Sequence, residues 1–431
     1  MRIYLDSIGC RLNQSEIETL GRGFRGQGHE ITAEAGGADL AVINTCAVTV
    51  QAGAESRKLL RRVKREGAGE VIATGCWATF DPGGAAALPG VSRVVPNRDK
   101  DRLVPLALGL PDEVFDLEPV ARVPLPGAQL RTRAYIKVQD GCDNRCTFCI
   151  TTVVRGEGRS RPLGDVLADI DAAVQGGTKE IVLTGVHLGS WGQDGGDEAA
   201  DAGLRIRDLV AAVLRETAAP RVRLSSLEPW DLDPGFFGLW ADEPRLCRHL
   251  HLPLQSGCDR TLRRMARKTS QKSFRKLVRE AREACPEIAI TTDLIAGFPG
   301  ESEAEFDETA AFVEEMAFAG AHVFPYSQRP GTAAAAMPGQ VDHPVRKQRA
   351  AALRRIVRKS ERRYRAQFTG RALDVLWENA SALGPDGWHM SGLTDNYLRI
   401  SAVTPRDMWN ELTPVVLEKV TEEGMNGRIG E

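Results

Sequence analysis

Short apolar segments alternate with amphipathic segments through the first part of the chain. Strands are predicted at residues 3–8, 40–45 and 70–75, and helices at 14–25 and 51–66. Strands that alternate with helices favour a parallel sheet, because parallel strands need a crossover connection between them. We therefore expect an N-terminal parallel α/β domain over residues 1–115.

The central part of the chain repeats the strand-then-helix pattern six times. Strands are predicted at residues 134–139, 180–186, 222–227, 249–254, 288–298 and 321–327, with helices at 164–175, 273–284 and 303–318. Six such units favour a partial (β/α)6 barrel, in which reactive groups lie at the carboxyl ends of the strands. We expect this barrel over residues 128–366, after a proline-rich linker at residues 111–127.

The last part of the chain has a different pattern, with apolar and polar residues that alternate in short runs. Strands are predicted at residues 372–378, 396–403 and 413–420, with a turn at 384–387. This pattern favours a small antiparallel β-barrel over residues 367–431. The fold class is therefore α/β, with a β-barrel at the C-terminal end.

The composition is that of a soluble globular protein with a large core. Hydrophobic residues make up 42 % of the 431 residues and charged residues 26 %. No apolar run approaches the ~20 residues that cross a bilayer, and the N-terminus lacks a secretory signal, so we expect a cytoplasmic location and no membrane contact. The net charge is −2, but basic runs at residues 57–65 and 345–365 can form local positive surfaces. The pattern does not indicate an oligomeric state.

The chain holds nine cysteines, and their odd number in a large chain favours metal binding or catalysis over disulfides. Cys10, Cys46 and Cys76 each follow a predicted strand. Because the carboxyl ends of parallel strands meet at one edge of a sheet, we expect these three thiols to lie together. The remaining cysteines outside the central motif, at positions 247, 258 and 285, are expected to be packed thiols.

The sharpest motif is the spacing of Cys142, Cys146 and Cys149. A structural zinc site usually has four protein ligands, and no fourth cysteine stands near these three, so zinc is the weaker alternative. A [4Fe–4S] cluster held by three thiolates would leave one iron open to another ligand.

This spacing resembles the signature of the radical S-adenosylmethionine enzymes. The resemblance implies that S-adenosylmethionine binds the open iron and is cleaved to a 5′-deoxyadenosyl radical, with a low-potential electron donor such as flavodoxin or ferredoxin. It assigns cofactor contacts to Phe148, Thr184, Gly185, Gln255 and Asp293 and, in a glycine-rich turn, to Ile295, Gly297, Pro299 and Gly300.

The segments SIGCRLNQSE, NTCAVT and TGCWA resemble the N-terminal domain of the methylthiotransferases within that superfamily. The resemblance implies a second [4Fe–4S] cluster on Cys10, Cys46 and Cys76, which supplies the inserted sulfur. Thr79 departs from the glutamine of many relatives, so hydrogen bonding near this cluster is expected to differ. The C-terminal barrel resembles a TRAM domain, which implies an RNA substrate. Candidate RNA contacts are Trp377, Trp388 and Tyr397.

Three central segments, LSSLEP, TGVHLGSWG and HVFPYSQRPGTAAAAM, resemble the MtaB-type branch of the family. The branch implies methylthiolation of C2 of N6-threonylcarbamoyladenosine, next to the anticodon of tRNA. We predict that Glu228, a catalytic-site residue, and Arg329 contact the threonylcarbamoyl group. His187 and His251 are expected to be structural. The alternatives are isopentenyladenosine in tRNA or a ribosomal-protein aspartate as substrate. A more distant one is a non-enzymatic iron–sulfur protein that binds RNA and senses oxygen or iron.

Overall fold

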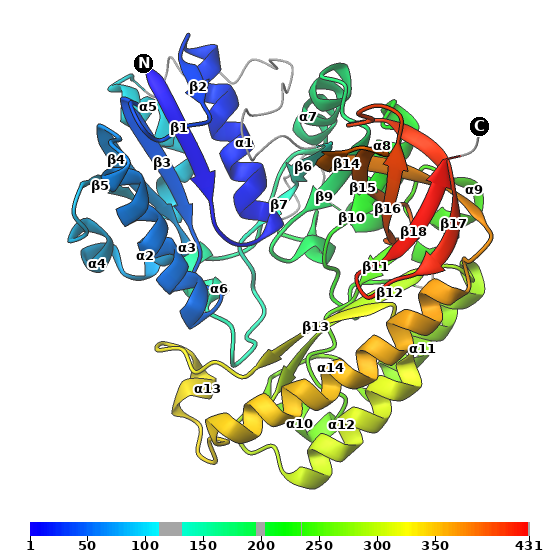
Figure 1. Ribbon diagram of the computed structural model, residues 1–431. Helices are drawn as coiled ribbons and strands as arrows, with labels where there is room; N and C mark the ends of the chain where they lie inside the picture. Colours follow the sequence, from blue (N-terminus) through cyan, green and yellow to red (C-terminus); the bar gives the residue numbers. More distant parts are fainter. Residues whose placement is uncertain (112–131, 195–202, 234, 430–431) are drawn as a thin grey trace.

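The computed structural model describes residues 1–111, 132–194, 203–233 and 235–429 (Figure 1). The predicted linker, except Pro111, and the boundaries at 115 and 128 lie outside these residues.

The N-terminal part is a five-stranded parallel sheet with the order β2-β1-β3-β4-β5. Its strands are β1(Arg2–Ser7), β2(Glu30–Thr32), β3(Leu40–Thr45), β4(Glu70–Gly75) and β5(Val91–Val95). Its helices are α1(Arg11–Gly26), α2(Val50–Arg65), α3(Cys76–Phe80), α4(Pro82–Ala86), η1(Asn97–Arg102) and α5(Leu103–Leu108).

The central strand β3 explains why this sheet is covered on both faces. All its residues are buried, as expected of a strand in a parallel sheet between helices. Its alternate residues enter two different apolar clusters, one with Leu40 and Val42 and the other with Ala41 and Ile43. The parallel direction of β1, β3 and β4 brings their carboxyl ends to one edge of the sheet, as predicted.

The central part forms a six-stranded parallel arc in two sheets, β10-β9-β6 and β11-β12-β13. Parallel bridges from Val222 to Leu246 and from Ser226 to His251 join the sheets, so the strands follow one another in chain order. The strands are β6(Arg133–Lys137), β9(Glu180–Thr184), β10(Val222–Leu224), β11(His249–His251), β12(Ala289–Ala296) and β13(Gly320–Pro325), and a ribbon of β7(Gln139–Asp140) and β8(Arg159–Ser160) flanks them. The helices are α6(Thr151–Arg155), α7(Leu163–Gln175), η4(Leu188–Ser190), α8(Ile206–Glu216), η5(Phe236–Gly238), α9(Leu239–Asp242), α10(Asp259–Arg264), α11(Gln271–Ala284), α12(Glu303–Met316), α13(Ala333–Ala336) and α14(His343–Ala366).

The C-terminal part is a closed barrel with the order β14-β15-β16-β18-β17. Its strands are β14(Ala372–Gly384), β15(Gly387–Thr394), β16(Arg399–Thr404), β17(Leu412–Val420) and β18(Met425–Ile429). The predicted turn at 384–387 joins β14 to β15 in a hairpin. The barrel is antiparallel apart from one pair, because β16 and β18 run parallel.

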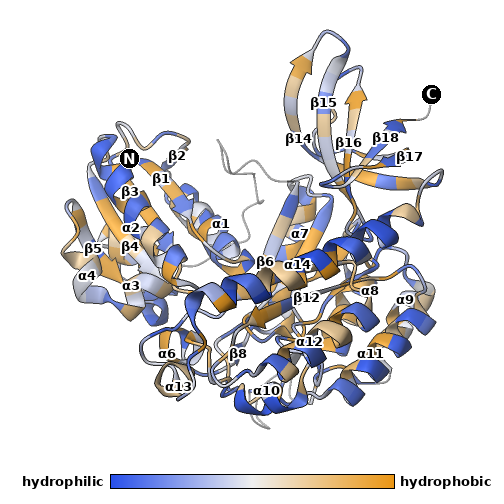
Figure 2. Cartoon of the chain, turned by 60° about the horizontal axis from the view of Figure 1, so that its bottom comes forward, coloured by the Kyte–Doolittle hydropathy of each residue, from blue (hydrophilic) through white to orange (hydrophobic). Residues whose placement is uncertain are grey.

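In Figure 1 the N-terminal sheet lies at the upper left and the C-terminal barrel at the upper right, and strands β11, β12 and β13 lie below them. Helix α1 packs against β6, and the long helix α14 packs against β12, β13 and α12. Figure 2 shows hydrophobic residues along the sheet strands and hydrophilic residues along most of α14. Within the described residues, none of the helices has the length and apolar character needed to span a membrane.

Candidate functional site

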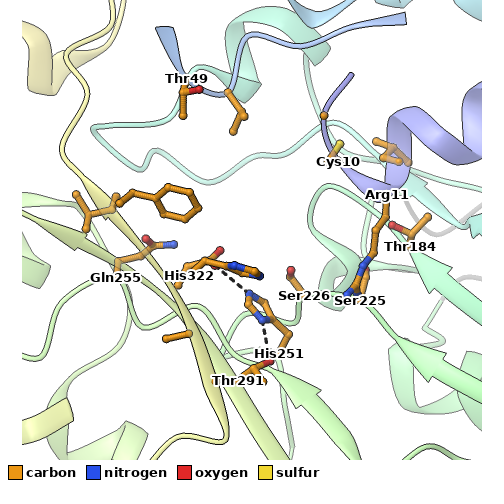
Figure 3. A pocket seen from close by; sticks show the side chains of 18 of the residues that line it. Cys10, Arg11, Thr49, Thr184, Ser225, Ser226, His251, Gln255, Thr291 and His322 are labelled. Atoms are coloured by element: carbon orange, nitrogen blue, oxygen red, sulfur yellow. Dashed lines mark hydrogen bonds and ion pairs between the residues drawn. The ribbon is translucent and has the colours of Figure 1, made fainter. Parts of the chain in front are cut away.

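A cavity of about 860 Å³ lies where the three parts of the chain meet. Figure 3 shows Cys10, Thr49, Gln255 and His322 around it, on segments distant in sequence. The predicted residues that line it are Cys10, Cys46, Cys76, Phe148, Cys149, Thr184, Gly185, Gln255, Asp293, Ile295, Arg329 and Tyr397. The predicted residues Cys142, Cys146, Glu228, Gly297, Pro299 and Gly300 are not among those lining it.

Close packing holds Cys46 at the sheet edge, and N–H donors reach the sulfur atoms of Cys46 and Cys76. Gly9 has a φ of +113°, and a Cβ at this position would lie 2.7 Å from the Cys46 Sγ, so only glycine fits there. The backbone N–H of Val48 donates to the Cys46 Sγ at 3.4 Å, and Asn97 Nδ2 donates to the Cys76 Sγ at 3.6 Å. Donors aimed at sulfur suit thiolates, which accept hydrogen bonds.

Thr79, where the motif departs from many relatives, contributes to this arrangement. Its hydroxyl donates to the carbonyl of Gly75 at 2.8 Å and accepts the backbone N–H of Asn97 at 2.9 Å. The Asn97 side chain also donates to the carbonyl of Val154, on α6, at 2.8 Å. Thr79 therefore positions the amide that contacts Cys76 and the segment that follows Cys149.

A buried charge network lies behind the same thiols. The carboxylate of Glu16 accepts from Lys100 Nζ at 2.7 Å and from Arg155 Nη1 at 2.9 Å. Arg155 also donates to Asn13 Oδ1 at 2.8 Å and pairs with Asp140 at 2.9 Å. Burial alone would raise the pKa of Glu16, but Arg155 and Lys100 hold it well below the usual range. The guanidinium thus connects the barrel to the N-terminal sheet beside the thiols.

The second set of thiols has its own polar surroundings. Arg267 Nη1 donates to the Cys146 Sγ at 3.7 Å, and the backbone N–H of Thr151 donates to the Cys149 Sγ at 3.4 Å. Arg267 Nη1 also donates to Glu228 Oε1 at 3.0 Å, and the Arg267 Cζ lies 4.5 Å from the ring centroid of Trp230. The Glu228 carboxylate is therefore engaged behind Cys146.

Beside Cys142, a histidine pairs with a carboxylate that its sequence context did not reveal. His187 Nε2 lies 2.7 Å from the carboxylate of Asp231, and the ring also contacts the side chain of Asn144 at 3.3 Å. Burial alone would lower the pKa of His187, but Asp231 and the Cys142 thiol raise it to about 10. The Asp231 carboxylate therefore fixes the His187 ring beside the loop that carries Cys142 and Asn144.

The glycine-rich turn after β12 has a conformation that its glycines require. Gly297 has a φ of +73° and Gly300 a φ of +74°, which glycine adopts without strain. The backbone N–H of Gly297 donates to Glu301 Oε1 at 3.0 Å, and Arg349 holds the same carboxylate at 2.8 Å. Gln255, with a φ of +71°, pairs its backbone with β12 at the cavity wall. Of this region, Gln255 and Ile295 line the cavity, whereas Gly297, Pro299 and Gly300 do not.

The donor set fits iron–sulfur clusters, although the structure contains no metal. Burial raises the pKa of Cys46 to about 12 and also raises that of Cys146. Such thiols stay protonated until a metal replaces the proton, so binding is coupled to proton release. Among the described residues, no three His, Cys, Asp or Glu side chains converge closely enough to hold a single metal ion. A four-iron cluster places each cysteine on a different iron and needs a wider set of thiols.

The candidate RNA-contacting aromatic residues occupy three different environments. Trp377 is fully buried in the barrel core and donates to the Thr413 hydroxyl at 2.8 Å, so it is not on the RNA-accessible surface. Trp388 is partly buried against the same core. Tyr397 stacks on His249 with ring centroids 4.0 Å apart, and its hydroxyl accepts from Arg11 at 3.0 Å. Tyr397 therefore joins the barrel to the cavity wall.

Sequence reasoning assigned no role to several polar residues that surround the thiols. Asn13 and Glu16 follow Cys10 at intervals of three along α1 and face the buried network, a helical spacing that could have indicated them. The residues missed are Arg11, Asn13, Glu16, Asn97, Lys100, Arg155, Ser225 and Arg267. Arg155 and Lys100 carried no local signal, because their partners are distant in sequence.

Comparisons with known proteins identify relatives of the chain. Residues 136–313 match the Radical SAM superfamily, and residues 2–95 match the family described as "Uncharacterized protein family UPF0004". The chain is 34 % identical to threonylcarbamoyladenosine tRNA methylthiotransferase MtaB of Bacillus subtilis, over 96 % of this chain and 93 % of that protein. It is also 34 % identical to the MtaB protein of Thermotoga maritima, over 98 % of this chain and 96 % of that one.

Two further comparisons show the breadth of the similarity. The tRNA-2-methylthio-N(6)-dimethylallyladenosine synthase of Sphingopyxis alaskensis is 33 % identical, over 87 % of this chain and 86 % of that protein. The solved radical S-adenosylmethionine methyltransferase TsrM of Kitasatospora setae has a TM-score of 0.57 at 15 % identity, over 78 % of this chain and 77 % of that one, which shows a shared fold. The long alignments and the two sets of cysteines together lead to one conclusion: the chain belongs to the family of radical S-adenosylmethionine methylthiotransferases.

Proposed function

We propose that the chain transfers a methylthio group to C2 of N6-threonylcarbamoyladenosine in tRNA. The observation that carries this proposal is the shared cavity, because Cys10, Cys46 and Cys76 of one set and Cys149 of the other all line it. A reaction that needs both a radical and a sulfur donor requires the two sites to reach one carbon atom. A cavity of about 860 Å³ has room for a nucleoside together with S-adenosylmethionine.

Each set of thiols has a separate role in this proposal. Cys142, Cys146 and Cys149 hold one [4Fe–4S] cluster, and Cys10, Cys46 and Cys76 hold another. When bound, these groups and S-adenosylmethionine supply the radical and the methylated sulfur. Phe148, Gln255 and Ile295, at the cavity wall, position the adenosyl group together with Thr184, Gly185, Asp293 and the turn that contains Gly297, Pro299 and Gly300. A low-potential donor such as flavodoxin or ferredoxin supplies electrons.

The substrate assignment is supported by the relatives and by the cavity wall. Both MtaB relatives align over nearly the whole chain. Ser225 and Ser226, from the segment LSSLEP, line the cavity. Their hydroxyls provide hydrogen bonds for a polar N6 substituent, whereas the isopentenyl group of the dimethylallyladenosine substrate is a hydrocarbon.

The decisive experiment is nucleoside mass spectrometry of total tRNA from a deletion strain and from the same strain complemented with the wild-type gene. We expect loss of 2-methylthio-N6-threonylcarbamoyladenosine and accumulation of the unthiolated nucleoside in the deletion strain, with recovery on complementation. Complementation with the Cys142→Ala variant should fail. If a different methylthio nucleoside or a ribosomal-protein modification disappears instead, the substrate assignment is wrong.

The roles of the two thiol sets can be separated in a reconstituted protein under anaerobic conditions. Triple replacement of Cys142, Cys146 and Cys149 by Ala should abolish release of 5′-deoxyadenosine. Triple replacement of Cys10, Cys46 and Cys76 by Ala should leave that release but stop sulfur insertion. Methylthiolation by the N-terminal triple variant at the wild-type rate would contradict its role. A wild-type protein that releases no 5′-deoxyadenosine would favour the non-enzymatic sensor.

A further inference from the structure

The arginines around the cavity are not equivalent, because several are already paired. Arg133 forms an ion pair with Glu378 at 2.7 Å, and Arg365 lies 3.7 Å from Glu361. Arg155 belongs to the buried network described above. These three guanidinium groups are therefore not free to bind an anionic ligand.

The remaining cavity arginines occupy three separate places. Arg329 lies near Cys149 and Cys46, and burial lowers its pKa. Arg399 is exposed on the C-terminal barrel. Arg11 extends from the start of α1 towards the strand ends that carry Ser225 and Ser226 (Figure 3). Within the described residues, the neutral hydroxyl of Tyr397 is the single hydrogen-bond partner of the Arg11 guanidinium.

A second unsatisfied group lies on the same wall. The Oγ of Ser225 is buried and has no hydrogen-bond partner among the described residues, and the residue as a whole is 4 % exposed. A buried hydroxyl without a partner costs free energy, so its presence points to a ligand group that completes its hydrogen bonding. Ser225 stands directly after β10 and lines the cavity together with Arg11.

We propose that Arg11 and Ser225 form the subsite for the free carboxylate of the threonylcarbamoyl group. This inference rests on the proposed function and deepens it, because it states how the enzyme selects its substrate. The threonylcarbamoyl group ends in a carboxylate, which a guanidinium binds with charge-assisted hydrogen bonds. An isopentenyl group offers no acceptor, so it would leave Arg11 without an anionic partner and the Ser225 hydroxyl without any hydrogen bond. Selection between the two nucleosides therefore depends on the charge at this wall.

The test uses two anticodon stem-loop RNAs that differ in one group. The first carries N6-threonylcarbamoyladenosine with its free carboxylate, and the second carries the same nucleoside as its methyl ester. Equilibrium binding to the reconstituted full-length protein is measured by fluorescence anisotropy, and methylthiolation by mass spectrometry. We expect the wild-type protein to bind the free acid about tenfold or more tightly than the ester, as for a charged hydrogen bond.

The variants identify which side chain gives this preference. Arg11→Met should bind the two RNAs alike, Arg11→Lys should keep part of the preference, and Ser225→Ala should reduce it. The matched control is Arg399→Met, which removes another cavity arginine and should leave the ratio of the two dissociation constants unchanged. Because Arg11 follows Cys10, iron content and 5′-deoxyadenosine release are measured for each variant. Ser225→Ala provides the test at a position outside both sets of cysteines.

Three outcomes would overturn the inference. The first is a wild-type protein that binds acid and ester equally, and the second is an Arg11→Met variant that keeps the wild-type preference. The third is an Arg11→Met variant that loses binding affinity equally for both RNAs. That result would place Arg11 against the RNA or the cofactor. Failure of the proposed function would look different, because the wild-type protein would then leave the free-acid RNA unmodified while thiolating another substrate.

Discussion

Glu16 shows how strongly one side chain can bind two parts of the chain together. Its side chain is 3 % exposed, and it pairs with Arg155 and Lys100, which are 3 % and 4 % exposed. Glu16→Gln leaves the buried Lys100 without its counter-charge and Arg155 with Asp140 alone, so we expect a loss of about 3–5 kcal/mol of unfolding free energy. Urea unfolding of the cluster-free protein measures this loss, and the exposed Glu34→Gln serves as the control. A loss no larger than that of the control would contradict the network.

The ion pairs of Glu16 with Arg155 and Lys100 make the unfolding free energy depend on pH. Burial alone would raise the pKa of Glu16, but Arg155 and Lys100 hold it well below its ordinary value. A depressed pKa contributes stability above the unfolded value of about 4.3 and loses it as the pH falls through the folded value. We therefore expect the stability difference between wild type and Glu16→Gln to be constant near neutral pH. This difference in unfolding free energy should become smaller below about pH 4.

Asn97 connects the N-terminal thiols to helix α6 by hydrogen bonds. Its side chain donates to the Cys76 Sγ and to the carbonyl of Val154. Asn97→Ala should lower the iron affinity of the N-terminal site by about 10–100-fold, the usual effect of removing a hydrogen bond to a metal ligand. Iron per chain is measured in a background in which Cys142, Cys146 and Cys149 are Ala. Unchanged iron binding would show that the contact is dispensable.

At the scale of elements, the turn after β12 depends on its backbone conformation. Gly297 has a φ of +73°, and a Cβ there would lie 3.1 Å from the Arg346 Cα and closer still to its Cγ. Gly297→Ala should therefore cost about 1–3 kcal/mol and weaken S-adenosylmethionine binding, measured by calorimetry. Gly83→Ala is the control, because a Cβ there meets no atom within 4 Å. Equal binding by both variants would remove the turn from the cofactor site.

Most elements with a strong hydrophobic pattern could be predicted from the sequence. The six barrel strands and α1, α2, α7, α11 and α12 lie where periodicity indicated, with shifts of a few residues at the ends. Strands β2, β5, β8, β15 and β18 were missed. β2 has only three residues, and β15 contains Gly387 and Gly392, which weaken a strand pattern. Tertiary pairing, rather than local preference, makes these segments strands.

At the scale of the whole molecule, the C-terminal barrel is a docked part of the structure. Arg223 is fully buried, pairs with Glu180 at 2.7 Å, and donates to the carbonyls of Thr394 and Asp395 at 3.0 and 2.9 Å. Arg248 pairs with the Asp395 carboxylate at 2.6 Å. Removal of residues 367–431 should therefore lower the melting temperature by about 5 °C or more, in addition to weakening RNA binding. Differential scanning fluorimetry checks this, and an unchanged melting temperature would contradict the docking.

The contacts that assemble the site lie beyond what local sequence can predict. The three strand-end cysteines were expected together because parallel strands fix their direction. In contrast, Glu16 and Arg155 are separated by 139 residues, and no spacing rule relates them. Glu228 illustrates the same point, because its motif was visible but its pairing with Arg267 depends on how β11 and α10 bring that arginine to Cys146.

The buried network has a consequence for the order in which the chain matures. Residues 1–111 leave the ribosome before Arg155 has been translated, so the nascent N-terminal sheet holds Glu16 and Lys100 without the cation that completes their network. Asn97 likewise lacks its contact with Val154 at that stage. We expect the emerging N-terminal segment to stay loosely folded until helix α6, which contains Val154 and Arg155, has been synthesised. Iron delivery to Cys10, Cys46 and Cys76 would then be a late, post-translational event, and a ribosome-stalled fragment ending before residue 140 should not retain iron.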